Sequence, residues 1–276
     1  MPEGDTLFKA AARLRVMVGQ VVTRFVAPSL DAVDPTGRTI SDVEARGKNL
    51  LMWFDGTHAL YTHLRMSGSW HLHRPGEGWR RPTHGARAVV ETAEWVAICF
   101  HAPVVEWLTA WEVTHHPVLA RLGPDLLGSE DADATVEAAV ERLRAEPGRP
   151  LGEAVLDQRA VAGLGNVYKS ELLFLERLDP FAPVGSYDAA TLRRLLVAGR
   201  TWMRRNVGDG PRRTRWTPGA GNTWVYGRVN EPCARCGEPI AMRRQGAAGR
   251  STYYCPRCQR GQAAPRGRVM VRGAAR

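Results

Sequence analysis

Four cysteines near the end of the chain constrain its folding most strongly. They form two pairs, Cys233-x2-Cys236 and Cys255-x2-Cys258, with eighteen residues between the pairs. In this pattern each pair makes a tight turn and presents two thiolates to one tetrahedral zinc ion. Disulfides are the alternative, but we expect an intracellular protein, where disulfides are rare. The spacing therefore predicts one structural zinc ion held by all four cysteines.

The segment between the two pairs is expected to form a β-hairpin. Residues 240–244 and 251–254 have the pattern of short strands, and the glycine-rich stretch 246–250 supplies the turn. A unit of this size has too little core to fold alone, and zinc binding worth on the order of 10 kcal/mol would supply the missing stability. The fifth cysteine, Cys99, lies in the apolar run 95–100 and is expected to be a buried hydrophobic residue.

The charge balance points to a polyanionic partner. The 276 residues carry a net charge of +10, and 44% of them are hydrophobic, enough for a substantial core. Nucleic acid is the simplest partner for such a basic protein, and a membrane surface is the alternative. The sequence has no apolar run long enough to span a membrane, and charged residues occupy the first turns where a signal peptide would be apolar. We therefore expect a cytoplasmic protein that binds no membrane.

Hydrophobic periodicity divides the chain into several regions. A helix is expected at 6–18, followed by strands at 21–26, 40–45, 50–54, 59–64, 69–73, 86–91 and 95–100, which suggest a β-sandwich or barrel. Helices are expected at 131–145, 151–156, 167–175 and 189–205, and a Gly-, Pro- and Arg-rich loop at 207–223. The predicted fold is therefore multi-domain α+β, with boundaries at 1–115, 116–224 and 225–264 and a basic tail at 265–276.

The first residues offer a possible nucleophile. If Met1 is removed, Pro2 becomes a secondary amine, and α-amino groups have a pKa of about 8. Such an amine is partly neutral near pH 7 and condenses with a masked aldehyde such as C1′ of a deoxyribose to give an iminium. Glu3 could supply a proton. The alternative is that Pro2 only permits trimming of the methionine and that Glu3 is an ordinary acid at a helix start.

The stretch 157–169 contains two glycines and leads into the helix predicted at 167–175. Gly163 and Gly165 permit tight turns, and Asn166 follows them at the helix start. Exposed backbone N–H groups at a helix start form a phosphate site, to which an Asn side chain adds a donor. The alternative is a plain helix hairpin in which Asn166 is the N-cap.

Several of these motifs together resemble one known family. The start PEGD, Arg46-Gly47-Lys48, HLRMSGSW at 63–70, GLGNVYKSE at 163–171 and the terminal zinc ribbon occur in the order found in the formamidopyrimidine-DNA glycosylase and endonuclease VIII family. The resemblance spans nearly the whole chain. It implies an N-terminal β-sandwich with a leading helix, a helix-two-turn-helix domain and a zinc finger, with damaged DNA, double-stranded or partly single-stranded, in the cleft. It also implies a monomeric DNA repair enzyme, nucleoid-associated and bacterial.

The resemblance implies roles in catalysis for three residues. Pro2 would attack C1′ of the damaged nucleotide while Glu3 protonates the sugar or the leaving base. The iminium would then lose the 3′ phosphate by β-elimination and the 5′ phosphate by δ-elimination, which makes the protein a bifunctional glycosylase and abasic-site lyase. Lys48 matches the family's phosphate-binding lysine near the reacting sugar. On its own, Lys48 could equally be a surface charge.

Four further residues are expected to contact DNA. The resemblance implies that Asn166 holds a backbone phosphate and that Arg250, in the hairpin turn, grips the phosphates flanking the lesion. Lys169, on the same helix as Asn166, is also expected to bind DNA. Met66 resembles the apolar wedge that fills the hole left by a flipped base, because unstacking a base costs a few kcal/mol. A methionine is more often a core residue, and an isolated turn arginine is usually only solvated.

Two departures bear on the substrate and on the activity. Position 6 is Thr6, where many members have a glutamate, and the segment 102–107 lacks the Arg-Phe pair with which formamidopyrimidine-DNA glycosylases read the opposite strand. The chain therefore resembles endonuclease VIII more closely, and oxidised pyrimidines are the expected substrates. One alternative is a damaged-DNA-binding protein of the same fold whose catalytic activity is lost or weak because of Thr6. A second alternative is a zinc-ribbon protein that binds RNA.

Overall fold

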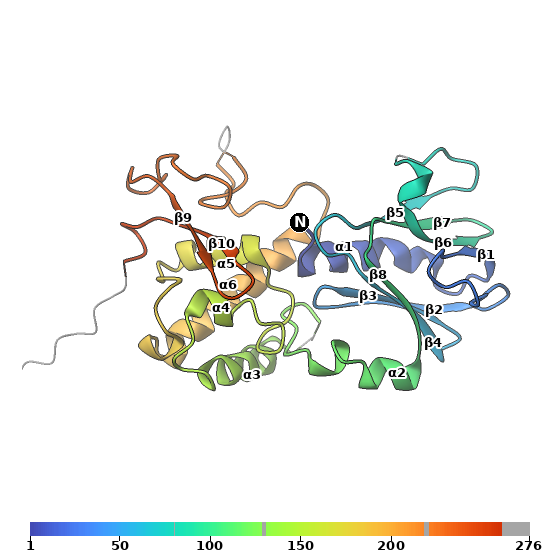
Figure 1. The fold of residues 1–276 in the computed structure, drawn as a ribbon, viewed down its shortest axis with the longest axis horizontal. Helices are drawn as coiled ribbons and strands as arrows, with labels where there is room; N and C mark the ends of the chain where they lie inside the picture. Colours follow the sequence, from blue (N-terminus) through green and yellow to red (C-terminus); the bar gives the residue numbers. More distant parts are fainter. Residues whose placement is uncertain (80, 129–130, 218–220, 261–276) are drawn as a thin grey trace, which may run out of the picture.

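The computed structural model describes residues 1–79, 81–128, 131–217 and 221–260. The basic tail predicted at 265–276 lies outside this part of the chain. Figure 1 shows two lobes, one built mainly from strands and one mainly from helices, with the N-terminus at the junction between them. Within the described residues, no helix is both long and apolar enough to span a membrane.

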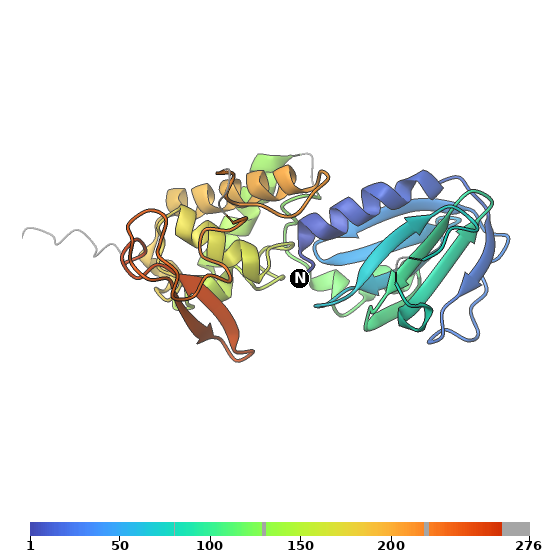
Figure 2. The ribbon, with the colours of Figure 1, turned by 90° about the horizontal axis from the view of Figure 1, so that it is seen from above.

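The first helix, α1 (Gly4–Leu14), continues into a 3-10 turn, η1 (Arg15–Met17). Leu7, Ala11 and Leu14 recur at helical spacing and are buried. They join one apolar cluster with residues of both sheets of the strand lobe, so α1 packs along the sandwich. Figure 2 shows α1 running from the lobe junction over the strands. This arrangement places residues 1–3 between the lobes.

The strand lobe is a sandwich of two four-stranded antiparallel sheets. The first has the order β1-β6-β7-β5 and the second the order β2-β3-β4-β8. Their bounds are β1 Val22–Val26, β2 Ile40–Arg46, β3 Asn49–Phe54, β4 His58–His63, β5 Ser69–His73, β6 Ala86–Thr92, β7 Val96–Phe100 and β8 Val104–Thr109. The predicted strands are confirmed, and the sandwich is confirmed over a closed barrel. Strand β8 was not predicted.

Strand β8 lies at the edge of the second sheet, paired with β4. It leads into a short helix, α2 (Ala110–His115), whose first turn is capped by the Thr109 hydroxyl, which accepts the Glu112 N–H at 3.2 Å. Part of the segment 102–107, which lacks the Arg-Phe pair, therefore lies in a strand. Short 3-10 turns complete the connections: η2 Thr83–Gly85, η3 Leu119–Arg121 and η4 Val184–Ser186.

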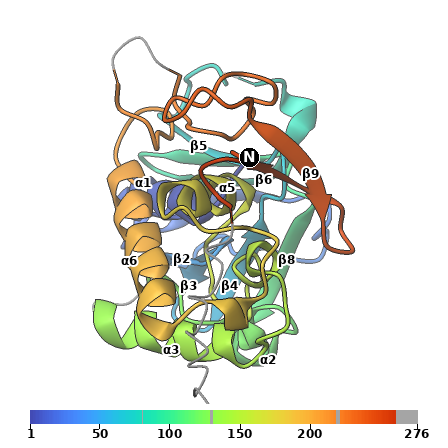
Figure 3. The same ribbon diagram turned by 90° about the vertical axis from the view of Figure 1, so that its left-hand side faces the viewer.

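The helical lobe has its own apolar core. It contains α3 (Ala132–Arg144), α4 (Leu151–Ala154), α5 (Asn166–Leu175) and α6 (Ala189–Asn206), close to the predicted ranges. Asp131 and Asp188 cap α3 and α6 by accepting backbone N–H groups. Helix α5 is buried along nearly its whole length, so it is the central element of this lobe. Figure 3 shows it at the centre of the lobe, with α6 on one side and the hairpin on the other.

The hairpin consists of β9 (Ala241–Gln245) and β10 (Arg250–Tyr254), paired from Gln245 with Arg250 to Ala241 with Tyr254. It packs on α5, where the Tyr253 N–H donates to Ser170 Oγ at 3.3 Å. The predicted zinc-ribbon hairpin is therefore confirmed as a unit that depends on the helical lobe for support.

The two lobes meet at the tip of the β2–β3 hairpin. Gly47 has a φ of +58°, which favours glycine in this tight turn. Its N–H donates to Asp125 Oδ2 at 2.5 Å, and a Cβ at Gly47 would lie 3.1 Å from Ala162 Cβ. The Gly4 N–H donates to the Gly163 carbonyl at 2.9 Å. These contacts hold the next residue of the tip, Lys48, against the helical lobe.

Candidate active site

A cleft of about 820 Å³ lies between the lobes. Residues from distant parts of the chain line it, and they include six of the seven residues predicted to act on DNA: Pro2, Glu3, Lys48, Met66, Asn166 and Arg250. The structure therefore brings the first residues of the chain, the β2–β3 tip, the start of α5 and the turn of the zinc hairpin into one site.

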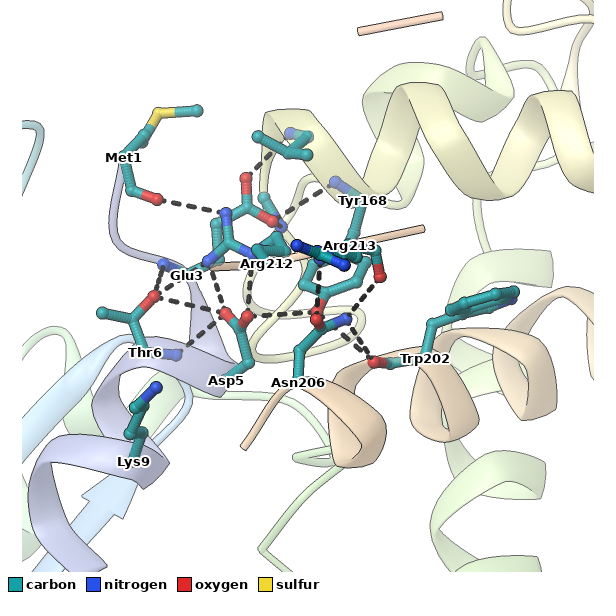
Figure 4. A network of polar contacts seen from close by, with 12 residues as sticks. Met1, Glu3, Asp5, Thr6, Lys9, Tyr168, Trp202, Asn206, Arg212 and Arg213 are labelled. Carbon is teal, nitrogen blue, oxygen red and sulfur yellow. Dashed lines mark hydrogen bonds and ion pairs between the residues drawn. The ribbon is translucent and has the colours of Figure 1, made fainter. Parts of the chain in front are cut away.

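Glu3 is buried at the start of α5. Its carboxylate accepts the backbone N–H groups of Gly165 at 3.1 Å, Val167 at 2.8 Å and Tyr168 at 3.3 Å. An acidic group is stabilised by the unpaired N–H groups and the dipole of a helix N-terminus. Figure 4 shows the carboxylate between the N-terminal segment and α5. The expectation that these N–H groups are exposed to bind a phosphate is wrong, because the protein's own carboxylate occupies them.

A second network surrounds Asp5 and Arg212. The Arg212 Nε donates a hydrogen bond to Asp5 Oδ2 at 2.7 Å, and its Nη2 donates one to Thr6 Oγ1 at 2.8 Å. The Tyr168 hydroxyl donates to Asp5 Oδ2 at 3.1 Å, as Figure 4 shows. Burial would lower the pKa of Arg212, but the Glu3 and Asp5 carboxylates raise it. Arg212 is therefore held against Asp5 with its positive charge favoured.

Thr6 contributes to the geometry of the N-terminus. Its hydroxyl accepts the Glu3 N–H at 3.3 Å. This is the backbone half of a capping box, in which the N3 side chain satisfies the N-cap N–H. Thr6 thus stabilises the turn that carries Glu3, and Asp5 is engaged by Arg212 rather than facing the cleft as a free acid.

Lys48 is half-buried in the cleft wall. Burial lowers its pKa to about 8, with the positive charges of Arg250 and Arg212 acting in the same direction and Glu3 opposing them. An ammonium group beside a carboxylate and facing an open cleft suits a phosphate ligand or a proton-transfer role. Lys48 therefore carries a charge that responds to pH near neutrality.

Met66 lies on the exposed loop after β4. Its side chain is 61% exposed although it lines the cleft, so the alternative of a core methionine does not hold. Gly68 permits this loop to fold back tightly, since a Cβ there would lie 2.7 Å from the Leu64 carbonyl oxygen. The geometry presents an apolar side chain to whatever occupies the cleft.

His63, at the base of the same loop, also lines the cleft. Burial lowers its pKa to about 4, helped by the charges of Arg65 and Lys48. The Arg65 N–H donates to His63 Nδ1 at 3.1 Å, so the neutral ring carries its proton on Nε2. The histidine is therefore a neutral hydrogen-bond donor at neutral pH.

Asn166 and Lys169 connect the start of α5 to the zinc hairpin. Asn166 Nδ2 donates to the Ser251 carbonyl at 2.7 Å, and Gly165, not Asn166, is the N-cap. Lys169 Nζ donates to Thr252 Oγ1 at 2.7 Å, and the residue is only 1% exposed. Arg250, at the start of β10, is exposed and lines the cleft. The position of Lys169 favours an indirect role in placing the hairpin; direct contact with DNA stays a prediction for it.

Helix α5 also organises the long loop that follows α6. The buried Glu171 carboxylate accepts the N–H groups of Trp224, Val225 and Tyr226 at 2.7 to 2.9 Å. Successive residues of the GLGNVYKSE motif thus bind different segments: the N-terminus, the hairpin and the loop. The motif therefore has a structural role in joining these segments.

The four cysteines at 233, 236, 255 and 258 converge in the hairpin region. Their sulfur atoms all lie within 4.8 Å of one another, with Cys233 and Cys258 Sγ 3.9 Å apart and Cys236 and Cys255 Sγ 3.5 Å apart. These spacings exceed a disulfide bond and match thiolates arranged around one ion. The donor set fits a single structural zinc. Cys99 is fully buried in the sandwich, as predicted.

Comparisons with known proteins agree with this fold. Three family models match the chain: the formamidopyrimidine-DNA glycosylase N-terminal domain over residues 1–103, its H2TH domain over 122–215, and the zinc finger found in FPG and IleRS over 230–261. The chain belongs to the formamidopyrimidine-DNA glycosylase family.

Family relatives include proteins of the endonuclease 8 type. The chain is 44% identical to a probable endonuclease 8 2 of Streptomyces coelicolor, over 99% of both chains. It is 40% identical to the DNA-(apurinic or apyrimidinic site) lyase Nei2 of Mycolicibacterium smegmatis, over 94% of this chain and 99% of that one. Its fold matches a Lactococcus lactis Fpg in complex with DNA containing an abasic site, with a TM-score of 0.75, 24% identity, and 93% and 99% of the chains covered. Enzymes of this family are DNA glycosylases and lyases of DNA repair.

Some residues of this family member's site were not foreseen. His63 and Arg65 lie in a motif read from the sequence, but nothing in their spacing assigned them a role. Asp125 and Arg212 have no local signal, because their partners at Gly47 and Asp5 are remote in sequence. Residues on either side of α4 add an ion-paired cluster to the cleft wall, with Asp157 between Arg149 and Arg159.

Proposed function

We propose that the chain is a bifunctional DNA glycosylase and abasic-site lyase that removes oxidised bases, chiefly pyrimidines, in base excision repair. The observation that carries the proposal is that Pro2 and Glu3 line the same inter-lobe cleft as Lys48, Asn166 and Arg250. The names of the endonuclease 8 and abasic-site lyase relatives support the reaction class. The substrate is damaged DNA, double-stranded or partly single-stranded.

The proposed chemistry begins with removal of Met1, which turns the Pro2 amide nitrogen into a secondary amine. The amine forms a bond to C1′ of the damaged nucleotide, the bond from C1′ to the base breaks, and Glu3 delivers a proton to the sugar or the leaving base. Opening of the sugar gives an iminium. Loss of the 3′ phosphate by β-elimination and of the 5′ phosphate by δ-elimination follows, and hydrolysis frees Pro2.

The positions around Pro2 and Glu3 suit this chemistry. The hydrogen bonds that Glu3 accepts from the start of α5 fix its carboxylate beside Pro2. Lys48 and Arg250 supply positive charge for the flanking phosphates, and the Asn166 side chain lies at the same edge of the cleft. Exposed Met66 is placed to fill the gap left by a flipped base. The net charge of +10 adds general attraction to DNA.

The preference for pyrimidines rests on the chain itself. It lacks the Arg-Phe pair at 102–107 that would read the strand opposite an oxidised purine. Thr6 does not favour the alternative of an inactive binding protein, because its hydroxyl supports the turn that carries Glu3. We also propose the domain boundaries 1–115, 116–224 and 225–264, and a cytoplasmic, nucleoid-associated location in a bacterium.

Borohydride trapping on abasic DNA tests the proposal. Reduction of the iminium should link the mature protein covalently to the DNA, and Pro2→Gly should weaken trapping sharply. Pro28→Gly, at an exposed proline outside the cleft, serves as the control and should trap like the wild type. A wild type that binds abasic DNA but never crosslinks would overturn the proposal. Single-lesion oligonucleotides would then rank oxidised pyrimidines against oxidised purines.

A further inference from the structure

Arg212 connects the loop after α6 to the first residues of the chain. Its guanidinium donates to both carboxylate oxygens of Asp5 and to the Thr6 hydroxyl, and Nη1 donates to the Met1 carbonyl at 3.2 Å. The side chains of Arg212 and Asp5 are 16% and 4% exposed. A two-nitrogen arginine–carboxylate pair shielded from water holds its geometry more strictly than a surface ion pair.

The Asp5 side of this pair is fixed from another direction as well. The Tyr168 hydroxyl, on buried helix α5, donates to Asp5 Oδ2 at 3.1 Å, and the Arg212 guanidinium lies 5.1 Å from the Tyr168 ring centre. Arg212 is therefore positioned by both lobes. Figure 4 shows it between the Met1–Glu3 segment and Tyr168.

Removal of Met1 takes away the carbonyl to which Arg212 Nη1 donates. The Met1 carbonyl carbon is bonded directly to the Pro2 nitrogen, so a donor within 3.2 Å of that carbonyl oxygen lies close to the same nitrogen. When Met1 is gone, the carbonyl acceptor is lost while the bonds to Asp5 and Thr6 remain. The guanidinium of the Arg212–Asp5 ion pair is then left beside the newly formed amine.

We propose that Arg212 is a positioning residue for the N-terminal nucleophile: it holds the Asp5–Thr6 turn that places Pro2 and keeps the freed amine in its neutral, attacking form. This inference rests on the proposed function. A nearby positive charge disfavours the protonated amine, so the amine stays nucleophilic at lower pH.

Other charges surround Pro2 and act on its amine. Glu3, adjacent in the chain, favours the protonated amine, whereas Lys48 on the β2–β3 tip and Arg250 on β10 disfavour it. Arg65 follows β4 in the same cleft, His63 beside it is neutral, and the Tyr168 hydroxyl on α5 is engaged by Asp5. Asp5 is neutralised by Arg212 itself. Among these groups, Arg212 is the one bonded to the residue that precedes Pro2.

The test measures the single-turnover rate of borohydride trapping on a preformed abasic duplex as a function of pH. Arg212→Gln removes the charge, and Arg212→Lys keeps the charge without the two-nitrogen geometry. Arg213→Gln is the matched control, since Arg213 is the next residue of the same loop and its guanidinium lies over the Trp216 ring at 5.9 Å. Intact mass confirms that Met1 is absent from each variant assayed.

We expect Arg212→Gln to trap at least tenfold more slowly at pH 7, with the midpoint of its rate profile raised by about one pH unit. Arg212→Lys should be slower than the wild type but keep the wild-type midpoint. Arg213→Gln should match the wild type in both. An Arg212→Gln variant with the wild-type rate and midpoint would overturn the inference. If that variant does not fold, Arg212→Lys decides the question, and a midpoint raised by a full pH unit in Arg212→Lys would overturn the inference. A wild type that never traps would instead refute the proposed function.

Discussion

The Glu3 carboxylate accepts the backbone N–H of Val167 over 2.8 Å, across a separation of 164 residues. The bond joins the first turn of the strand lobe to the first turn of the central helix of the other lobe. Closing so long a loop has an entropic free-energy cost, which the favourable contacts formed when both lobes fold must offset. The acid proposed to act on DNA is thus held in place only when the two lobes are correctly assembled.

Gly165→Ala should displace Glu3. Gly165 has a φ of −121°, which alanine adopts without strain, but an added Cβ would overlap the Glu3 carboxyl group. Overpacking of this kind costs about 1–3 kcal/mol. We expect base excision to fall at least tenfold with a modest loss of thermal stability, measured by cleavage of a lesion oligonucleotide and by melting.

Gly148→Ala is the control for this substitution. A Cβ there would have no atom within 4 Å among the described residues, and its φ is not positive. It should excise at the wild-type rate. Wild-type excision by Gly165→Ala would show that the position of Glu3 is not required.

DNA affinity should decrease as the pH rises through about 8. Burial lowers the pKa of Lys48 to about 8, so its charge is present below that pH and lost above it. A charged hydrogen bond to phosphate is worth about 1.5–3 kcal/mol, so its loss should weaken binding roughly tenfold or more between pH 7 and pH 9. Titration of a labelled abasic duplex at constant ionic strength measures this change.

Lys48→Arg isolates the contribution of this lysine, because arginine keeps its charge over the whole range. Burial also lowers the pKa of Lys169 to about 8, and that group titrates in both proteins. The variant should therefore lose less affinity at pH 9 than the wild type. Lys9→Arg, outside the cleft, should behave as the wild type. Identical pH dependence in Lys48→Arg and the wild type would count against a phosphate contact by Lys48.

Removal of zinc should weaken DNA binding strongly while the sandwich and the helical lobe stay folded. The hairpin depends on its four thiolates, whereas the sandwich and the helical lobe have separate apolar cores. Chelation, or Cys255→Ser, should lower DNA affinity at least tenfold because Arg250 loses its place in the cleft. Metal analysis should give one zinc per chain, and Cys99→Ala should retain it. Undiminished affinity in the metal-free protein would contradict this account.

The strands, helices and zinc hairpin could be predicted because their signals are local. Alternating apolar residues, capping aspartates and paired cysteines each act within a few positions. Strand β8 was missed although residues 104–109, Val-Val-Glu-Trp-Leu-Thr, favour a strand; Pro103 directly precedes them, and the pairing with β4 that fixes the strand is a tertiary contact. Six of the seven predicted site residues line the cleft. They could be predicted because their motifs together resemble one family, whereas no single motif identified them.

The internal partners of the site could not be predicted from local patterns. A helix N-terminus predicts a site for an anionic group, but the pattern does not distinguish a bound phosphate from the protein's own Glu3 carboxylate. Asp5 and Arg212 are 207 positions apart, and an arginine in an arginine-rich loop has no distinctive spacing. The burial of Lys169 depends on a hairpin docked from the far end of the sequence.

The central claim is that the Pro2 nitrogen forms the covalent bond to the sugar. Peptide mapping by mass spectrometry of the borohydride-reduced complex with abasic DNA tests it most directly. The account predicts that the sugar remnant is attached to an N-terminal peptide that begins at Pro2, with Met1 absent. A remnant attached to Lys48 or to any other side chain, or found on a chain that retains Met1, would contradict the account.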